Sequence, residues 1–204
     1  LLIVSHNNRK DLELLIPSLF KALSNFKADY NKSYEILIVD NCCRDSTSSF
    51  IKNNYPEIKL HKNKKCAGYG TNQNKNIKRA KGEYIVLMNP DMVVFDNIFK
   101  IMISFMDQHR DAAMATCKVC NSDGSCQYLN KREPAIFDLL VRRFCPTRLQ
   151  HRFKKRLDAY EMRDVGYDKV VDVPFISGSF IFARREVFKD VGCFDERFFM
   201  YFED

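Results

Sequence analysis

The sequence contains no run of apolar residues long enough to cross a membrane. A membrane-spanning helix needs roughly 20 consecutive apolar residues, and every apolar stretch in these 204 residues ends well before that length. The first residues also lack the basic and then apolar pattern of a secretory signal peptide. We therefore expect no part of residues 1–204 to insert in a bilayer.

Glycine and proline are scarce, with seven and six residues, and the glycine-rich phosphate-binding motifs are missing. Neither the P-loop spacing G-x-x-x-x-G-K-[ST] nor the dinucleotide fingerprint G-x-G-x-x-G occurs. No linker rich in Pro, Gly or Ser divides the chain, and no repeat or low-complexity tract interrupts it. With 46% apolar residues and 17 Phe, the chain can build a substantial core.

Eight cysteines leave disulfides, zinc and free thiols as alternatives. Cys117 and Cys120 form a C-x-x-C pattern and Cys126 follows, but a zinc site needs a fourth ligand. The segment CKVCNSDGSCQY is more typical of two short strands joined by a turn at Asp123-Gly124. The other five cysteines show no pairing pattern, which is typical of reduced thiols in the cytoplasm.

The net charge of +7 suits an anionic partner. Lys and Arg are concentrated at 62–65, 75–81 and 142–156. Solvated surfaces, acidic lipid headgroups, nucleic acid and a nucleoside diphosphate are all compatible with this pattern. Because no nucleic-acid-binding module accompanies the charge, we expect no nucleic-acid partner. Solvated surfaces are the favoured interpretation, and peripheral association of a cytoplasmic protein with the inner face of the membrane is the alternative.

Strand and helix patterns alternate through the first half of the chain. Continuous apolar runs predict buried strands, and apolar residues at three- and four-residue steps predict amphipathic helices between them. The expected strands are 1–5, 35–40, 57–63, 83–88, 112–119 and 179–184, and the main expected helices are 11–26, 71–82 and 98–109. This order predicts an α/β domain with a Rossmann-like, mostly parallel sheet and helices on both faces.

Polar residues follow each of the first four strands. Ser5-His6-Asn7-Asn8, Asp40-Asn41, Gly68-Tyr69-Gly70 and Asn89-Pro90-Asp91 come after strands one to four in turn. The carboxyl ends of parallel strands meet at one edge of a sheet, where ligands bind. Pro90 ends its strand, because proline has no backbone N–H. The four segments therefore predict a ligand crevice.

The chemistry of the acidic residues suggests their roles in this crevice. Asp91 can bind Mg²⁺ or Mn²⁺, which use one or two carboxylates and leave other positions to water and phosphates. Asp40, at the end of an apolar strand, can accept a hydrogen bond from a base or ribose. A solvated turn is the alternative for Asp91.

The segments VSHNNRKDLELLIPSL, ILIVDNCCRDST, AGYGTNQNKNIKRAKGEYIVLMNPD and ISGSFIFARREVFKDVGCFDERFFMYFED together resemble the family-2 glycosyltransferases of the GT-A fold. The likeness is strongest to the bacterial rhamnosyltransferase-like branch and runs from end to end. It implies transfer of a sugar from a nucleoside diphosphate donor, with inversion and a divalent metal, to a glycan or lipid-linked acceptor in cell-surface polysaccharide synthesis. Rhamnose on a thymidine carrier is the donor that this branch suggests.

The resemblance also implies site residues. Asn89-Pro90-Asp91 occupies the family's Asp-x-Asp position, so Asp91 would meet the metal, while Asp204, with Glu203 beside it, matches the general base. The residues expected to bind the donor are Ser5, Asn7, Asp40, Asn41, Gly68, Asn74, Asn89 and Asp91. Residues 1–116 would form the nucleotide-sugar half of the domain, and 117–204 a smaller mixed elaboration that binds the acceptor and carries the catalytic pair.

Some positions depart from the family pattern, and two other functions stay open. Asn72 and Asn76 replace glycines, and Cys43 replaces a serine. Because the sequence starts inside a strand pattern and stops at Glu203-Asp204, we expect a portion of a longer protein. A non-catalytic sugar- or nucleotide-binding module of the same fold is one alternative. A sugar nucleotidyltransferase is the other, although the SHNNRKD segment has no glycine.

Overall fold

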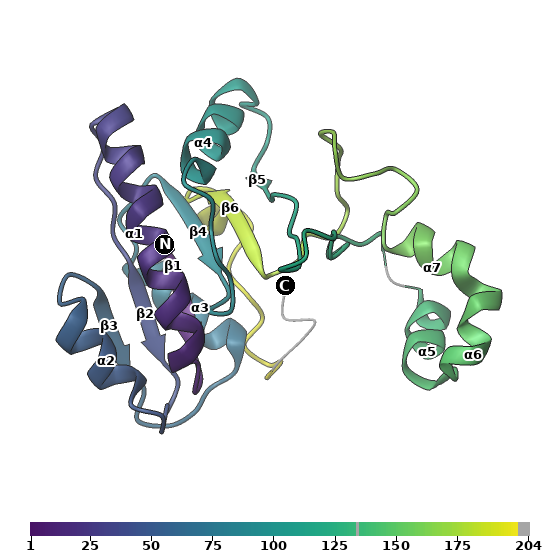
Figure 1. Ribbon diagram of the computed structural model, residues 1–204, viewed down its shortest axis with the longest axis horizontal. Coiled ribbons are helices and arrows are strands. Elements are labelled where there is room, and N and C mark those ends of the chain that lie inside the picture. Colours follow the sequence, from purple (N-terminus) through teal and green to yellow (C-terminus); the bar gives the residue numbers. More distant parts are fainter. Residues whose placement is uncertain (134, 200–204) are drawn as a thin grey trace. The chain divides into compact units, whose positions relative to one another are not determined.

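The chain folds into two compact units. A computed structural model describes residues 1–133 and 135–199. Unit 1 comprises Leu1–Ala115 with Gly178–Asp204, and unit 2 comprises Thr116–Ser177 (Figure 1). The chain returns to unit 1 at Gly178, and a strand that follows completes the sheet.

Unit 1 is built on one six-stranded sheet with the order β3-β2-β1-β4-β6-β5. Strands β1 to β4 are parallel, whereas β6 runs antiparallel to both β4 and β5. The sheet is therefore mostly parallel, as the sequence predicts. The strands are β1 Leu2–Ser5, β2 Leu37–Asp40, β3 Lys59–Lys62, β4 Tyr84–Met88, β5 Met114–Ala115 and β6 Phe180–Arg184.

Helices connect the parallel strands and cover the sheet on both sides. The helices of unit 1 are α1 Arg9–Tyr30, α2 Thr47–Asn54, α3 Tyr69–Arg79, α4 Ile98–Gln108 and α8 Val187–Asp190. The connection through α1 moves from β1 outward to β2, and the connection through α3 moves back from β3 to β4. Right-handed crossovers in these opposite directions place α1 and α3 on opposite faces. Helix α4 packs against α1.

The core lies on the central strands and the apolar stripe of α1. All four residues of β1 and of β2 are buried. Along α1, the residues at the predicted three- and four-residue steps have between 0% and 2% of their surface exposed; they are Leu12, Leu15, Ile16, Leu19 and Leu23. Burial of such side chains contributes roughly 1.5 to 3 kcal/mol each. This rigid layer fixes the strand ends that form the candidate site.

Unit 2 contains short helices and little strand structure. Its helices are α5 Ile136–Phe144, α6 Thr147–Gln150, the 3-10 turn His151–Phe153 and α7 Lys154–Tyr160. The expected hairpin is reduced to one antiparallel bridge, Cys120 to Cys126, around a turn in which Gly124 has a φ of +84°. No described helix in either unit is both long and apolar enough to span a membrane.

Candidate functional site

The ends of four strands meet at one edge of the sheet in unit 1. Ser5 pairs with Asp40 at the carboxyl ends of β1 and β2, and Met88 pairs with Phe180 where β4 ends and β6 begins. The Asn89 N–H donates to the Ser179 carbonyl at 3.0 Å, just beyond that pair. The polar segments that the sequence places after the strands therefore lie at a common edge, together with the residues that precede β6.

The loops after β1 and β2 are joined through Cys43. The Asn7 N–H donates to the Cys43 Sγ at 3.1 Å, and the same thiol donates to the Ser5 carbonyl at 3.3 Å. The Arg44 N–H donates to the Asn7 Oδ1 at 2.7 Å. Asn7 has a φ of +57°, a left-handed conformation that asparagine tolerates better than most residues. Cys43 therefore acts as a connector between the two loops, and its thiol pKa is raised mainly by burial.

Asp40 is fully buried and supports the second loop. Its Oδ1 accepts from the Cys43 N–H at 2.6 Å, and its Oδ2 accepts from the Ser48 hydroxyl at the start of α2. Both carboxylate oxygens are thus engaged within the protein. In the structure Asp40 supports the backbone that follows β2 and the start of α2.

Buried amides fill the space between the end of β2 and α3. Asn41 is 9% exposed, donates to the Ala67 carbonyl at 2.9 Å and accepts from the Ala67 N–H at 2.9 Å. Asn63 donates to both Asn41 and Asn72, and the Lys75 ammonium reaches the Asn63 Oδ1 at 3.0 Å. Asn72, which stands where the resembling family has glycine, thus joins a hydrogen-bond network.

The N-terminal half of α3 contacts residues 194–199, which precede Glu203-Asp204 in the sequence. A Cβ at Gly68 would lie 2.6 Å from the Phe199 carbonyl oxygen, which also accepts from the Tyr69 N–H at 2.9 Å. Asn74 is 3% exposed; it donates to the Phe194 carbonyl and to Glu196 Oε1, both at 2.9 Å, and accepts from the Phe194 N–H at 3.0 Å. Asn74 and Gly68 therefore position residues 194–199.

Asp91 is the exposed carboxylate at this edge. It lies in the turn directly after β4, where Asn89 is half-buried and anchored through its N–H. Among the described residues, no side chain forms a hydrogen bond or ion pair with Asp91. By contrast Asp96, farther along the same connection, is paired with Lys21 at 2.8 Å. Asp91 is therefore available to a ligand.

The residues present fit a divalent cation that takes most of its ligands from the phosphates of a bound substrate and from water. Within residues 1–133 and 135–199, no group of three or more His, Cys, Asp and Glu side chains is arranged to hold a metal. Mg²⁺ commonly binds through one or two carboxylates plus substrate phosphates and water. A single unpaired carboxylate at a ligand-binding edge suits that mode. The predicted catalytic pair Glu203-Asp204 lies outside the described residues.

The expected site residues thus fall into two groups. Asn7 and Asp91 present exposed side chains, and Asn89 is partly exposed. The others are buried and build the edge rather than face solvent; they are Ser5, Asp40, Asn41, Gly68 and Asn74. The sequence did not predict that Ser48 donates a hydrogen bond to Asp40 or that Cys43 connects the loops after β1 and β2. No local sequence pattern indicates which distant residue a hydroxyl or thiol will contact.

All eight cysteines are free thiols. Burial raises the pKa of Cys117 to about 11. The interpretation of CKVCNSDGSCQY as a turn agrees with the bridge between Cys120 and Cys126.

Comparisons with known proteins connect this geometry to a family. The model of the family described as Glycosyl transferase family 2 matches residues 1–192. A curated relative, the N-acetylglucosaminyl-diphospho-decaprenol L-rhamnosyltransferase of Mycobacterium tuberculosis, is 26% identical over 92% of this chain. The chain spans 64% of that relative's length.

Two solved structures share the fold of this chain. Staphylococcus aureus TarS 1–349 in complex with UDP gives a TM-score of 0.62 at 18% identity, over 99% of this chain and 51% of TarS 1–349. Mannosyltransferase PcManGT from Pyrobaculum calidifontis, in complex with GDP-Man and Mn²⁺, gives a TM-score of 0.53 at 15% identity, over 95% of this chain and 46% of its own. At these identities the likeness concerns the fold alone.

Proposed function

Because the chain belongs to glycosyl transferase family 2 and has the GT-A fold, we propose that it transfers a sugar from a nucleoside diphosphate donor, with inversion and a divalent cation, to a glycan or lipid-linked acceptor. The observation that carries the proposal is the position of Asp91. It is an exposed carboxylate without a protein partner in the described chain, and it lies at the sheet edge where the β1 and β2 loops also end.

We assign each part of the donor to a segment of this edge. The loops joined by Cys43 present Asn7 beside β1, and this is where we place the nucleoside. Asp40 and Asn41 support these loops by accepting hydrogen bonds from the backbone N–H groups of Cys43 and Ala67. The diphosphate would then extend toward β4, where Asp91 and the partly exposed Asn89 would face it.

Asp91 would hold Mn²⁺ or Mg²⁺ against the donor diphosphate. When bound, such an ion stabilises the negative charge that develops on the departing diphosphate oxygens. The protein's own contribution is the turn that carries Asp91, whose start is anchored by the Asn89 N–H bond to the Ser179 carbonyl. No acid side chain is then required at the leaving group.

Asp204, beside Glu203, would remove the proton from the acceptor hydroxyl. Inversion requires that oxygen to attack from the side opposite the diphosphate, so the base must stand across the sugar from Asp91. Asn74, Gly68 and the Tyr69 N–H hold residues 194–199, which lead directly into this pair.

The donor sugar and the pathway are also part of the proposal. The mycobacterial relative's name describes rhamnosyl transfer to a lipid-linked acceptor. We propose rhamnose as the first donor sugar to test, and cell-surface polysaccharide synthesis in the cytoplasm as the setting.

Calorimetry with nucleoside diphosphates, with and without Mn²⁺, tests the proposal. In Asp91→Ala the gain in affinity that Mn²⁺ provides should fall by at least about ten-fold. Asp96→Ala removes an exposed carboxylate from the same connection and should leave this gain unchanged. Equal Mn²⁺ dependence in wild type and Asp91→Ala would remove Asp91 from the metal site.

Donor hydrolysis or transfer distinguishes an enzyme from a non-catalytic binding module. The wild-type chain should release nucleoside diphosphate from its donor sugar, and Asp204→Asn should abolish release while donor binding persists. Binding without any turnover in the wild type, across a panel of donor sugars and acceptors, would favour the module.

A further inference from the structure

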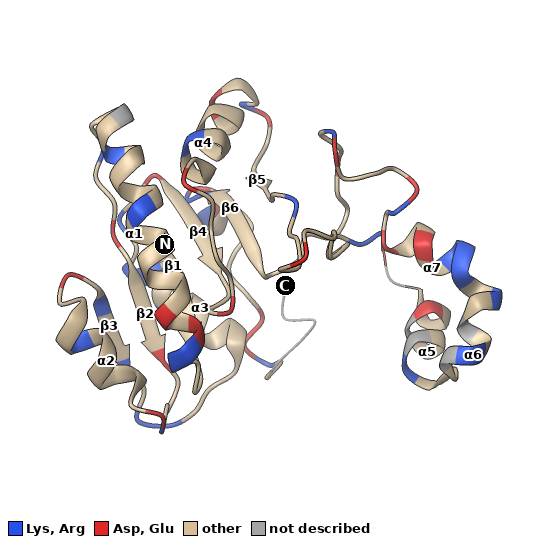
Figure 2. Ribbon diagram, viewed as in Figure 1, with Lys and Arg blue, Asp and Glu red and all other residues tan. Residues whose placement is uncertain are grey.

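Three short helices of unit 2 form a surface that is both basic and apolar. This basic apolar surface comprises α5, α6 and α7 with the turn between α6 and α7 (Figure 2). Residues 136–160, which span these elements, contain two acidic residues, Asp138 and Asp158, and seven basic residues, so their net charge is +5. Their seven basic residues are Arg142, Arg143, Arg148, Arg152, Lys154, Lys155 and Arg156.

Helix α5 presents an apolar face to solvent. Ile136, Leu140 and Phe144 follow one another at four-residue spacing, which places them on one side of the helix. Their surfaces are 78%, 50% and 74% exposed. The opposite side contains Val141 and Asp138, both only 6% exposed, and Asp138 is paired with Arg156. Among the described residues, one side of α5 is therefore packed and its apolar side is exposed.

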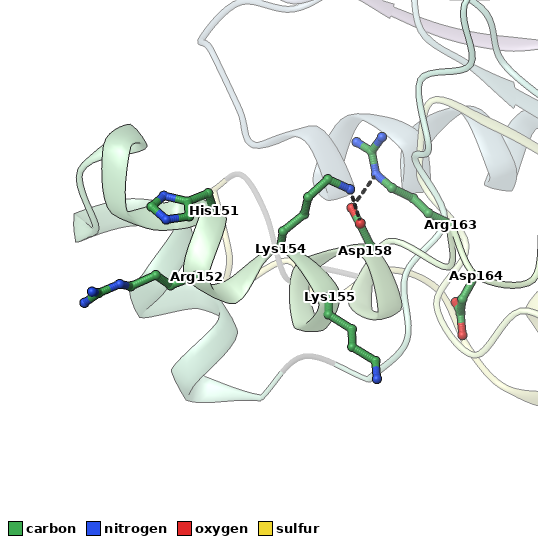
Figure 3. Close-up of a pocket in the computed structure, with 7 residues that line it drawn as sticks. All are labelled: His151, Arg152, Lys154, Lys155, Asp158, Arg163 and Asp164. Carbon is green, nitrogen blue, oxygen red and sulfur yellow. Dashed lines mark hydrogen bonds and ion pairs between the residues drawn. The ribbon is translucent and has the colours of Figure 1, made fainter.

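Basic side chains lie beside this apolar face. Arg143 and Arg148 are exposed and flank Phe144 and Leu149 in the sequence, and Leu149 is itself 46% exposed. In the nearby hollow of about 560 Å³, Lys154 and Arg163 converge on Asp158, whereas Arg152 and Lys155 extend away from it (Figure 3). Within the described part of the chain, no carboxylate pairs with Arg143, Arg148, Arg152 or Lys155.

We propose that this basic apolar surface binds the anionic surface of a membrane. A helix that lies in the interface buries an apolar face among acyl chains and places Lys and Arg at the headgroups. The aliphatic stripe of Ile136 and Leu140 supplies the first element, and the four exposed cations supply the second. Each basic residue near an anionic lipid surface strengthens binding by about five-fold.

Other partners fit these features less well. A second copy of the chain would bring two faces of the same positive charge together across a symmetric interface, which is unfavourable. Nucleic acid would match the cations but would leave Ile136 and Leu140 without an apolar partner. An anionic bilayer provides negative charge for the cations and acyl chains for Ile136 and Leu140. The inference does not depend on glycosyl transfer, because binding can be measured without donor or acceptor.

Vesicle sedimentation tests the proposal directly. The chain should sediment with vesicles of equimolar phosphatidylcholine and phosphatidylglycerol, only weakly with phosphatidylcholine alone, and less as salt is raised. The variant Ile136→Ser/Leu140→Ser/Phe144→Ser should lose on the order of a hundred-fold in partition coefficient. Arg148→Gln/Lys155→Gln should lose about 25-fold, from two contributions of about five-fold.

The matched control changes three exposed apolar residues in unit 1. Leu14, Ile101 and Val191 are 66%, 52% and 83% exposed, and their joint replacement by Ser should leave sedimentation unchanged. Circular dichroism should show the same helix content in all variants. The proposal is overturned if wild type ignores anionic vesicles, or if the α5 variant and the control sediment alike. It is equally overturned if the α5 face instead mediates self-association without lipid.

Discussion

Replacement of Asn74 by Ala separates a structural role from a binding role for this buried amide. The side chain makes three hydrogen bonds to the segment 194–196, two of them with the backbone of Phe194. The family resemblance implies that Asn74 lines the donor pocket, whereas the structure shows it turned toward Phe194 and 3% exposed. The two roles predict different outcomes for one substitution.

The expected loss of stability follows from these contacts. An intramolecular hydrogen bond contributes roughly 0.5 to 1.5 kcal/mol, and a buried group left without a partner costs more. Three bonds at 2.9, 2.9 and 3.0 Å therefore give a loss of about 2 to 4 kcal/mol in the free energy of unfolding. The residues released are those that lead to Glu203-Asp204, so sugar transfer should also slow.

Urea denaturation followed by circular dichroism measures the first quantity, and calorimetry with a nucleoside diphosphate measures donor affinity. We expect Asn74→Ala to be less stable and slower in transfer, with donor affinity unchanged. Asn54→Ala, which removes one exposed amide contact on α2, is the control and should change little. A variant as stable as wild type that binds donor more weakly would refute the structural assignment.

Three further predictions address other parts of the chain. Gly68→Ala should lower the free energy of unfolding by about 1 to 3 kcal/mol, because its Cβ would meet the Phe199 oxygen at 2.6 Å; Gly178→Ala, whose nearest atom is at 3.9 Å, should be tolerated in the same thermal melt. Although burial acts to raise it, the pKa of Glu35 is held below 4.5 by hydrogen bonds from Lys59 and from the Lys81 N–H. Because this pKa is depressed on folding, the stability that Glu35 provides over Glu35→Gln should be full above pH 4.5 and shrink as the pH falls; a difference independent of pH in urea titrations would contradict this. At mildly alkaline pH, Cys117, with its pKa raised to about 11 by burial, should be alkylated more slowly than exposed Cys120 in a mass-spectrometric time course, and equal rates would show that Cys117 is accessible.

Periodicity in the sequence predicts most of the first half of the fold. The apolar runs at 1–5 and 35–40 are confirmed as β1 and β2, and the stripe from Leu12 to Leu23 is confirmed as the buried face of α1. The direction of β6 was not predictable, because a run such as FIFAR suits a parallel or an antiparallel strand equally. The predicted fifth strand shrinks to Met114–Ala115, since it pairs with β6 alone.

The candidate site was predictable in its location and less so in its contacts. Strand ends place Asn7, Asp40 and Asp91 at one edge by topology alone. Whether a side chain at that edge faces solvent depends on partners far away in the sequence. Ser48 and Cys43 donate hydrogen bonds to Asp40, and the Asn74 side chain donates one to the Phe194 carbonyl. No local pattern in the sequence indicates these partners.

The chain leaves the sheet after β5, forms unit 2 with residues 116–177, and returns to the sheet in β6, which is hydrogen-bonded to β5. The pairs Met114 with Ala183 and Ala115 with Phe182 hold the two points of attachment next to each other. An insert anchored in this way can lengthen, shorten or be exchanged while the strands that carry Asn7 and Asp91 stay untouched. Chimaeras in which residues 116–177 are exchanged between relatives would therefore show which properties depend on the insert, because the rest of the scaffold stays the same.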